Sequence, residues 1–166
     1  IDYAAFGGGA GELGADCANA DLGGAGKALV IDSKEGTAGK AEIEAALESN
    51  FLSGAPGSEI VARIIASERA EALNKVSQTL QAHPEINVVI STNDEGALGA
   101  YGAFDAAGKA ITCIISSGGT DEVLQLIDEG KLYGASTLNF GADLMQTFDA
   151  VGMMLKDPSA DGRQQA

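Results

Sequence analysis

The chain has 166 residues, is 45% hydrophobic and 20% charged, and carries a formal net charge of −14. This length suits one domain with a substantial core, and the composition excludes a disordered or fibrous chain. The acidic balance argues against nucleic acid as a partner, which needs clustered lysine and arginine, and no apolar stretch is long enough to span a membrane.

Short β-branched runs alternate with longer amphipathic segments along the chain. Strands are expected at Lys27–Asp32, Glu59–Ala66, Asn87–Ser91, Ile111–Ser116 and Gly134–Leu138. Helices are expected at Ala5–Ala20, Ala38–Ser49, Glu68–Ala82, Asp94–Ala107, Asp121–Glu129 and Gly141–Leu155. This alternation predicts an α/β fold in which an open parallel sheet has helices on both faces, as in a Rossmann-like lobe. The polar tail at 157–166 has the composition of a linker.

The cysteines and the single histidine fall at positions typical of structural residues. Cys17 lies in an expected helix and Cys113 in an expected strand, and two cysteines do not make a disulfide framework. We therefore expect two free core thiols, which leave the cellular compartment undecided. His83 ends a helix just before Pro84, where a cation suits the helix dipole. Neither a Ser-His-Asp arrangement nor a metal-binding Cys/His spacing is indicated, so we expect no enzyme and no metal site.

A glycine motif near the amino terminus raises one alternative. Residues 9–14 (GAGELG) match G-x-G-x-x-G, and Asp32 follows at about the spacing of a ribose-binding acid. Read literally, the motif indicates a nucleotide-dependent oxidoreductase. A dinucleotide-binding motif should follow a buried strand, however. The only candidate, the apolar run at residues 1–6, is short and is interrupted by Asp2. We expect these glycines to serve helix entry and close packing, with no cofactor bound.

Polar residues follow two of the expected strands, where open α/β sheets bind their ligands. The Asn93 side chain can donate to and accept from a solute hydroxyl together, so we assign it to the ligand and expect its removal to leave the unliganded protein stable. Asp94 is expected to cap the next helix. The loop Ser116-Ser117-Gly118-Gly119-Thr120 offers backbone N–H groups and small hydroxyls, and it reads equally well as a ligand loop or as an ordinary turn.

The segment Asn93-Asp94-Glu95, with the helix beginning Ala97-Leu98-Gly99-Ala100, resembles the sugar-binding proteins of bacterial ABC importers. The lactose-repressor-type regulators share this resemblance, which runs from Ile1 to about Leu155. It implies two similar α/β lobes that clamp a ligand between them. Residues 1–140 would be the carboxy-terminal lobe, 141–156 a helix that returns to the first lobe, and 157–166 a polar tail. The first lobe and the final strand would lie outside this sequence.

The resemblance also carries site residues over to this chain. The family's binding asparagine matches Asn93, and Gly118 stands where relatives have an aspartate that grips two hydroxyls. Ser67 replaces a stacking aromatic ring, and Lys40 is the nearest cation to a ligand-holding arginine. Arg69 is expected to pair along its own helix. The candidate ligand-binding residues are Lys40, Ser67, Asn93, Ser116, Ser117, Gly118 and Asn139.

The implied function is that of an extracytoplasmic solute-binding protein that closes by hinge motion on a sugar or polyol. Its partner would be the membrane permease of the importer. The effector-binding domain of a lactose-repressor-type regulator is an alternative with the same fold. In this chain the apolar face of the 141–155 helix would lack its usual partner, the first lobe. That face includes Leu144, Phe148, Val151, Met154 and Leu155. We therefore expect this chain either to dock that helix on its own sheet or to self-associate.

Overall fold

The computed structural model describes residues 1–138 and 140–156. Its elements are α1 (Tyr3–Asp21), β1 (Lys27–Asp32), α2 (Lys40–Gly54), β2 (Glu59–Ile65), α3 (Arg69–Ala82), β3 (Val88–Ser91), α4 (Asp94–Ala106), β4 (Ile114–Ser117), α5 (Asp121–Asp128), β5 (Gly134–Ser136) and α6 (Phe140–Lys156). Residues 2–137 form one compact unit, and α6 belongs to a second unit. Each unit is described by itself.

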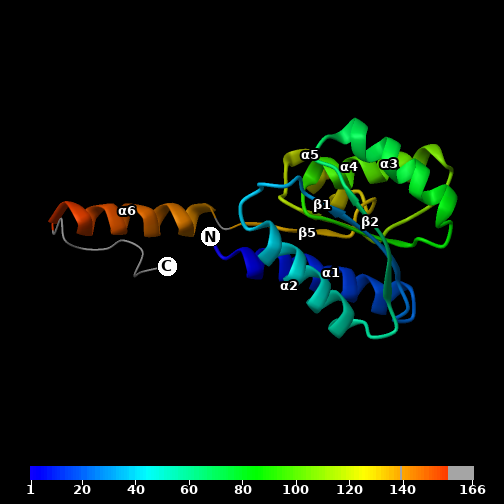
Figure 1. The fold of residues 1–166 in the computed structure, drawn as a ribbon, viewed down its shortest axis with the longest axis horizontal. Helices are drawn as coiled ribbons and strands as arrows, with labels where there is room; N and C mark the ends of the chain where they lie inside the picture. Colours follow the sequence, from blue (N-terminus) through cyan, green and yellow to red (C-terminus); the bar gives the residue numbers. More distant parts are fainter. Residues whose placement is uncertain (139, 157–166) are drawn as a thin grey trace. The chain divides into compact units, whose positions relative to one another are not determined.

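The larger unit is built on a parallel sheet of five strands in the order β2-β1-β3-β4-β5. Helices α1 and α2 cover one face, and α3, α4 and α5 cover the other (Figure 1). This arrangement confirms the predicted α/β fold with helices on both faces. Parallel sheets are covered in this way because every crossover between strands places a helix on a face.

The sheet separates two hydrophobic cores. Along β1, Ala28 and Val30 point to the α1 and α2 side, whereas Leu29 and Ile31 point to the α3 and α4 side. All four side chains are fully buried. This double burial explains why the central strands β1, β3 and β4 are rich in apolar residues, since neither of their faces meets water.

The glycines of α1 allow that helix to lie very close to α2. A Cβ atom on Gly11 would be 2.3 Å from the carbonyl oxygen of Leu47, and one on Gly7 would be 2.2 Å from that of Ile43. The G-x-G-x-x-G segment therefore lies inside α1 and packs against a helix. A dinucleotide fingerprint needs these glycines in the turn between a strand and a helix. The structure supports the close-packing interpretation and places no strand ahead of the motif among residues 1–138.

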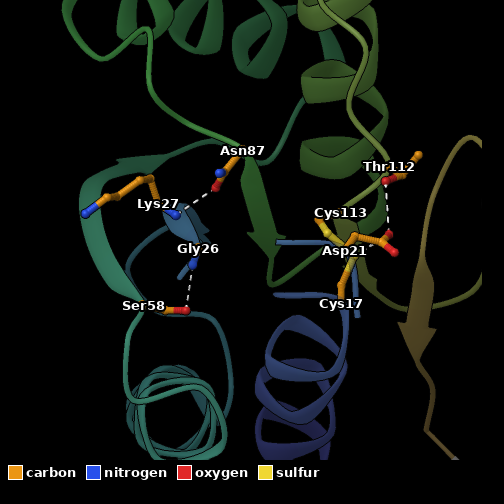
Figure 2. The surroundings of a disulfide bond; sticks show 8 residues. All are labelled: Cys17, Asp21, Gly26, Lys27, Ser58, Asn87, Thr112 and Cys113. Carbon is orange, nitrogen blue, oxygen red and sulfur yellow. Dashed lines mark hydrogen bonds between the residues drawn. A yellow bond between two sulfur atoms is a disulfide. The ribbon is translucent and has the colours of Figure 1, made fainter. Parts of the chain in front are cut away.

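The two cysteines form a disulfide, so the expectation of two free thiols is wrong. Cys17, in α1, bonds to Cys113, which precedes β4 and is not inside that strand as predicted (Figure 2). Their Cα atoms are 5.7 Å apart although 96 residues separate them. That distance is normal for a disulfide. The spacing of the two cysteines in the sequence does not predict this bond. They become neighbours because α1 packs against the sheet.

Helix α6 confirms the last predicted helix and carries several exposed apolar side chains. Phe148 is 62% exposed and Leu155 is 80% exposed, and Leu144, Val151 and Met154 are also exposed. The polar tail at 157–166 lies outside the described residues. None of the described helices combines the length and the apolar character that a membrane crossing requires.

Candidate ligand-binding edge

The carboxyl ends of the strands meet along one edge of the sheet. The chain passes from β1 to β2 on one side and returns to β3 on the other side of β1. In open α/β sheets, such a reversal of strand order opens a crevice beyond the strand ends. Ser33 follows β1, Ser67 lies beyond β2, Asn93 comes after β3 and Gly118 follows β4. Residues from four separate segments of the sequence therefore lie at one edge of the sheet.

Asn93 is the N-cap of α4, a role that the sequence analysis assigned to Asp94. Its side-chain Oδ1 accepts a hydrogen bond from the Gly96 N–H at 2.7 Å, and its Nδ2 donates to the Ala66 carbonyl at 3.0 Å. The backbone of Asn93 is extended, with φ −156° and ψ 159°, so helical geometry begins only at Asp94. An N-cap is the last residue before helical geometry starts, which decides the assignment.

Asp94 instead holds the β4–α5 loop. Its carboxylate accepts hydrogen bonds from the Ser116 hydroxyl at 2.5 Å, from the Gly119 N–H at 3.0 Å and from the Thr120 N–H at 2.8 Å. Partial burial would raise the pKa of Asp94, but these donors outweigh it and lower the pKa below its usual value. The Ser116 hydroxyl is therefore committed to the fold.

Gly118 lies against the same carboxylate. It has φ +150°, and a Cβ atom there would be 2.5 Å from Asp94 Oδ2. A side chain at this position would collide with Asp94. The conformation of this loop therefore leaves no room for the aspartate that relatives are expected to carry at the position of Gly118.

Ser117 points to the opposite face of β4 from Ser116. The residue is 3% exposed, and its Oγ has no hydrogen-bond partner in the described part of the chain. Buried hydroxyls usually have a partner, so this atom is a candidate for a solute or water contact.

A pair of hydroxyls between β1 and β3 was missed by the sequence analysis. Ser33 Oγ lies 2.8 Å from Thr92 Oγ1, and Thr92 Oγ1 donates to the Ile31 carbonyl at 3.2 Å. Because the Thr92 proton is used on Ile31, Ser33 is the donor to Thr92. Both residues directly follow strands, which was the available signal. Together with Thr37, Lys40, Ile43 and Glu44 they surround a narrow crevice that has no room for a water molecule.

Lys40 is at this edge, but it is not a free cation. Its ammonium group pairs with Glu44 one turn later in α2 and with Glu35 at 3.4 Å. The hydrogen bond to Glu44, with a smaller contribution from Glu35, raises the pKa of Lys40. A solute at this edge therefore meets a neutralised ion pair.

Ser67 and Arg69 also have protein partners. Ser67 Oγ accepts a hydrogen bond from the Lys34 N–H at 3.3 Å. Arg69 does not pair along its own helix as expected: it bridges Glu95 of α4 at 3.1 Å and Glu122 of α5 at 2.7 Å. Arg69 therefore joins the first turns of three helices. Asn139 lies outside the described residues.

Comparison with known proteins places this arrangement in a family. A family model described as "Periplasmic binding protein domain" matches residues 8–156. The ribose import binding protein of Salmonella typhimurium is 34% identical over 97 residues, which are 58% of this chain and 31% of that protein. The xylitol-binding protein of Mycolicibacterium smegmatis is 27% identical over 125 residues, or 74% of this chain and 36% of that protein. The chain thus spans about a third of these curated relatives.

Solved structures agree with the fold. The myo-inositol binding protein of Caulobacter, bound to myo-inositol, matches with a TM-score of 0.81 at 21% identity, over 96% of this chain and 54% of that one. An ABC transporter periplasmic solute binding protein from Actinobacillus succinogenes 130z, with bound D-allose, has a TM-score of 0.68 at 27% identity and covers 80% of this chain and 46% of that one. With the family model matched over residues 8–156, the chain belongs to the periplasmic binding protein domain family.

Proposed function

We propose that this chain is the carboxy-terminal lobe of an extracytoplasmic solute-binding protein that feeds an ABC importer. The solute is a sugar or polyol, bound between this lobe and a second one by hinge closure, with no bond made or broken. The membrane permease is the partner that receives it. The named relatives are a ribose import binding protein and a xylitol-binding protein, which favours the importer over a transcription regulator of the same fold.

The hydrogen-bonding capacity left on Asn93 is the observation that carries the proposal. An amide oxygen has two lone pairs and an amide nitrogen has two hydrogens. The fold uses one lone pair for Gly96 and one hydrogen for Ala66. One acceptor and one donor remain, and these are the two functions that a single solute hydroxyl requires. Asn93 can therefore act as a helix cap and as a ligand residue together.

Other groups at the edge favour an uncharged solute rich in hydroxyls. Ser33 and Thr92 place two hydroxyls at this edge, and Ser117 Oγ is unpartnered among the described residues. The charged groups nearby, Lys40 and Asp94, are already paired. A sugar or polyol needs hydroxyl and amide partners and no counter-ion, so the chemistry of the edge supports this class.

The disulfide supports an extracytoplasmic location. Disulfides persist in oxidising compartments and are rare where thiol reductants are abundant. Cys17 is fully buried and Cys113 is 1% exposed, so the bond belongs to the core of the lobe. This evidence is independent of the relatives.

A thermal-shift screen tests the proposal on the protein as its gene encodes it. Sugars and polyols should include ribose, xylitol, myo-inositol, D-allose and arabinose, with nucleosides, NAD and NADP in a contrasting arm. A true solute stabilises the folded protein by mass action and so raises its apparent melting temperature. At a solute concentration of a hundred times the Kd, the stabilisation is about 2.7 kcal/mol. Stabilisation by a sugar or polyol, reproduced by calorimetry, is expected. Saturable binding of a dinucleotide without any response to sugars or polyols would overturn the proposal in favour of an oxidoreductase.

A further inference from the structure

We propose that reduction of the Cys17–Cys113 disulfide converts it into a binding site for a thiophilic divalent cation, with Zn²⁺ as the fitting ion. The ligands are the thiolates of Cys17 and Cys113 and the carboxylate of Asp21. One ligand atom from each residue lies within 4.8 Å of the other two. Cys17 Sγ is 3.9 Å from Asp21 Oδ2. Sulfur and carboxylate ligands in this number suit zinc, which is commonly four-coordinate.

The fold brings Asp21 close to the two sulfur atoms of the disulfide. Cys17 and Asp21 are four residues apart in α1 and so share one face of that helix. Cys113 comes from the segment that enters β4, which packs against α1. Figure 2 shows Asp21 beside the disulfide, with its carboxylate directed toward Thr112. The Thr112 hydroxyl donates to Asp21 Oδ2 at 3.5 Å, which orients the carboxylate as outer partners of metal ligands do.

A cavity next to Cys113 offers the cation a path from the solvent and leaves room for a further ligand. A cavity of about 410 Å³ at the amino-terminal edge of the sheet is lined by Leu22, Thr112 and Cys113, among others. Asp21 is itself exposed. A cation can therefore reach the buried thiolates from the solvent, and a water molecule can complete a coordination shell of four.

Asp21 has no cationic partner that would explain its position. In the described part of the chain no lysine or arginine side chain forms a salt bridge with Asp21, whose carboxylate accepts a hydrogen bond from the Thr112 hydroxyl. The Asp21 carboxylate takes no part in the disulfide bond itself. It completes the donor set of a metal site once those sulfurs are thiolates.

The chemistry balances with a dithiol as the reductant. The dithiol supplies two electrons and two protons, the bond between the two sulfurs breaks to give two thiols, and the reductant becomes a disulfide. Binding of the cation then releases both thiol protons, because thiolates are the ligating form. Oxidation by a disulfide reverses the sequence and expels the ion. The site is thus open to the metal only in the reduced state.

Co²⁺ titration of the purified 166-residue chain tests this. The chain is reduced with dithiothreitol and freed of reductant without air, and the thiolate-to-cobalt charge-transfer absorption is then followed. We expect one Co²⁺ per reduced chain, displaced by Zn²⁺, and no absorption for the oxidised chain. Asp21→Asn should weaken binding by at least the roughly 10- to 100-fold that loss of an outer partner of a metal ligand costs, because Asp21 is itself a ligand. Asp16→Asn, an exposed aspartate on the same helix, is the matched control and should leave the affinity unchanged.

Three results would overturn the proposal. They are no cobalt binding by the reduced chain, equal affinity of Asp21→Asn and the parent, or equal binding by a Cys17→Ser/Cys113→Ser variant. If reduction unfolds the chain, circular dichroism replaces absorption as the readout. Recovery of the helical signal on adding Zn²⁺, absent in Asp21→Asn, supports the site. Failure of Zn²⁺ to restore that signal overturns it.

Discussion

At the scale of single residues, the candidate edge contains side chains that serve the fold and that we propose also bind the solute. Asn93 ends the extended stretch after β3, caps α4 through Gly96 and ties Ala66 beyond β2 to the same corner. The sequence analysis assigned it to the ligand alone. Its two protein hydrogen bonds revise the expectation that its removal leaves the unliganded protein unaffected.

Asn93→Ala should therefore lower stability as well as affinity. Loss of the cap costs about 0.5–2 kcal/mol of unfolding free energy. Loss of the solute hydrogen bonds costs roughly 1–3 kcal/mol of binding, about one to two decades in Kd. Urea unfolding of the unliganded protein and calorimetric titration measure the two effects. Asn93→Asp is the matched variant: it keeps the capping oxygen and should recover most of the stability but not the affinity. Unchanged stability in Asn93→Ala would show that the cap is unimportant.

Asp94 predicts a pH dependence. Its pKa is lowered in the folded state, so its contribution to stability is present above the unfolded pKa, about 3.9, and is lost as pH falls through the folded value. Asp94→Asn should destabilise the protein at pH 7 by about 1–3 kcal/mol, because the donors of Gly119 and Thr120 lose a charged acceptor. Urea unfolding of both proteins at pH 7 and near pH 3 should show the difference shrinking in acid. A difference that is independent of pH would contradict the assignment.

At the scale of elements, α1 is held by two features that compensate for its composition. Glycine is a poor helix former, at about 1 kcal/mol less favourable than alanine per interior position. Gly7 and Gly11 nevertheless allow close contact with the backbone of α2, and Cys17 anchors the later turns of α1 to the segment before β4. Packing and a covalent bond thus stabilise a helix whose sequence disfavours it.

Gly11→Ala separates packing from propensity. The added Cβ would meet the Leu47 carbonyl at 2.3 Å, so we expect a loss of about 1–3 kcal/mol in unfolding free energy despite the better helix former. Gly152→Ala in α6 is the control, because nothing lies within 4 Å of its Cβ position. It should be neutral or slightly stabilising. Chemical denaturation measures both, and a stabilised Gly11→Ala would show that α1 and α2 are farther apart than described.

The disulfide makes its own prediction. Cys17→Ala/Cys113→Ala should cost about 3–5 kcal/mol, because the bond closes a loop of nearly a hundred residues and so restricts the unfolded chain. Urea unfolding with a metal chelator present gives the free energy. Dithiothreitol should destabilise the parent protein by a comparable amount and leave the double variant unaffected. Equal sensitivity of both proteins to the reductant would indicate that the cysteines are unpaired in solution.

At the scale of the whole molecule, the chain combines a lobe that has its own two cores with a helix whose apolar residues are exposed. Phe148 is 62% exposed and Leu144 is 55% exposed, in contrast to the buried residues of β3 and β4. Burying one such side chain is worth about 1.5–3 kcal/mol, so several together favour association. In a longer protein, a second lobe would supply the cover.

The isolated 166-residue chain should therefore self-associate through α6. Sedimentation velocity over a range of concentrations should show reversible dimers or larger species, and Leu144→Glu/Phe148→Glu should shift the population to monomer. Asp149→Asn, a polar substitution on the same helix, is the control and should not change the equilibrium. A chain that stays monomeric at every concentration would contradict this expectation.

Local patterns in the sequence determined the elements, their order and the parallel sheet. Every predicted helix and strand is present, with ends that moved by a few residues; β4 begins at Ile114 and not at Ile111. These features follow from hydrophobic periodicity and turn residues, which are properties of neighbouring positions. The position of Asn93 directly after a buried strand and its polar linker was also predicted correctly, whereas its role in binding a solute stays a prediction.

Contacts between distant residues were decided only by the tertiary structure. The Cys17–Cys113 bond, the Arg69 pairs with Glu95 and Glu122, and the Ser33–Thr92 hydroxyl pair each join segments at least 26 residues apart. Asp94 likewise serves a loop that begins more than twenty residues later. No local pattern encodes these partners, because they depend on which strands are neighbours and which face each side chain takes. The sequence by itself therefore determined the elements and the sheet, and the packing of the sheet decided which polar groups at its carboxyl edge already have protein partners.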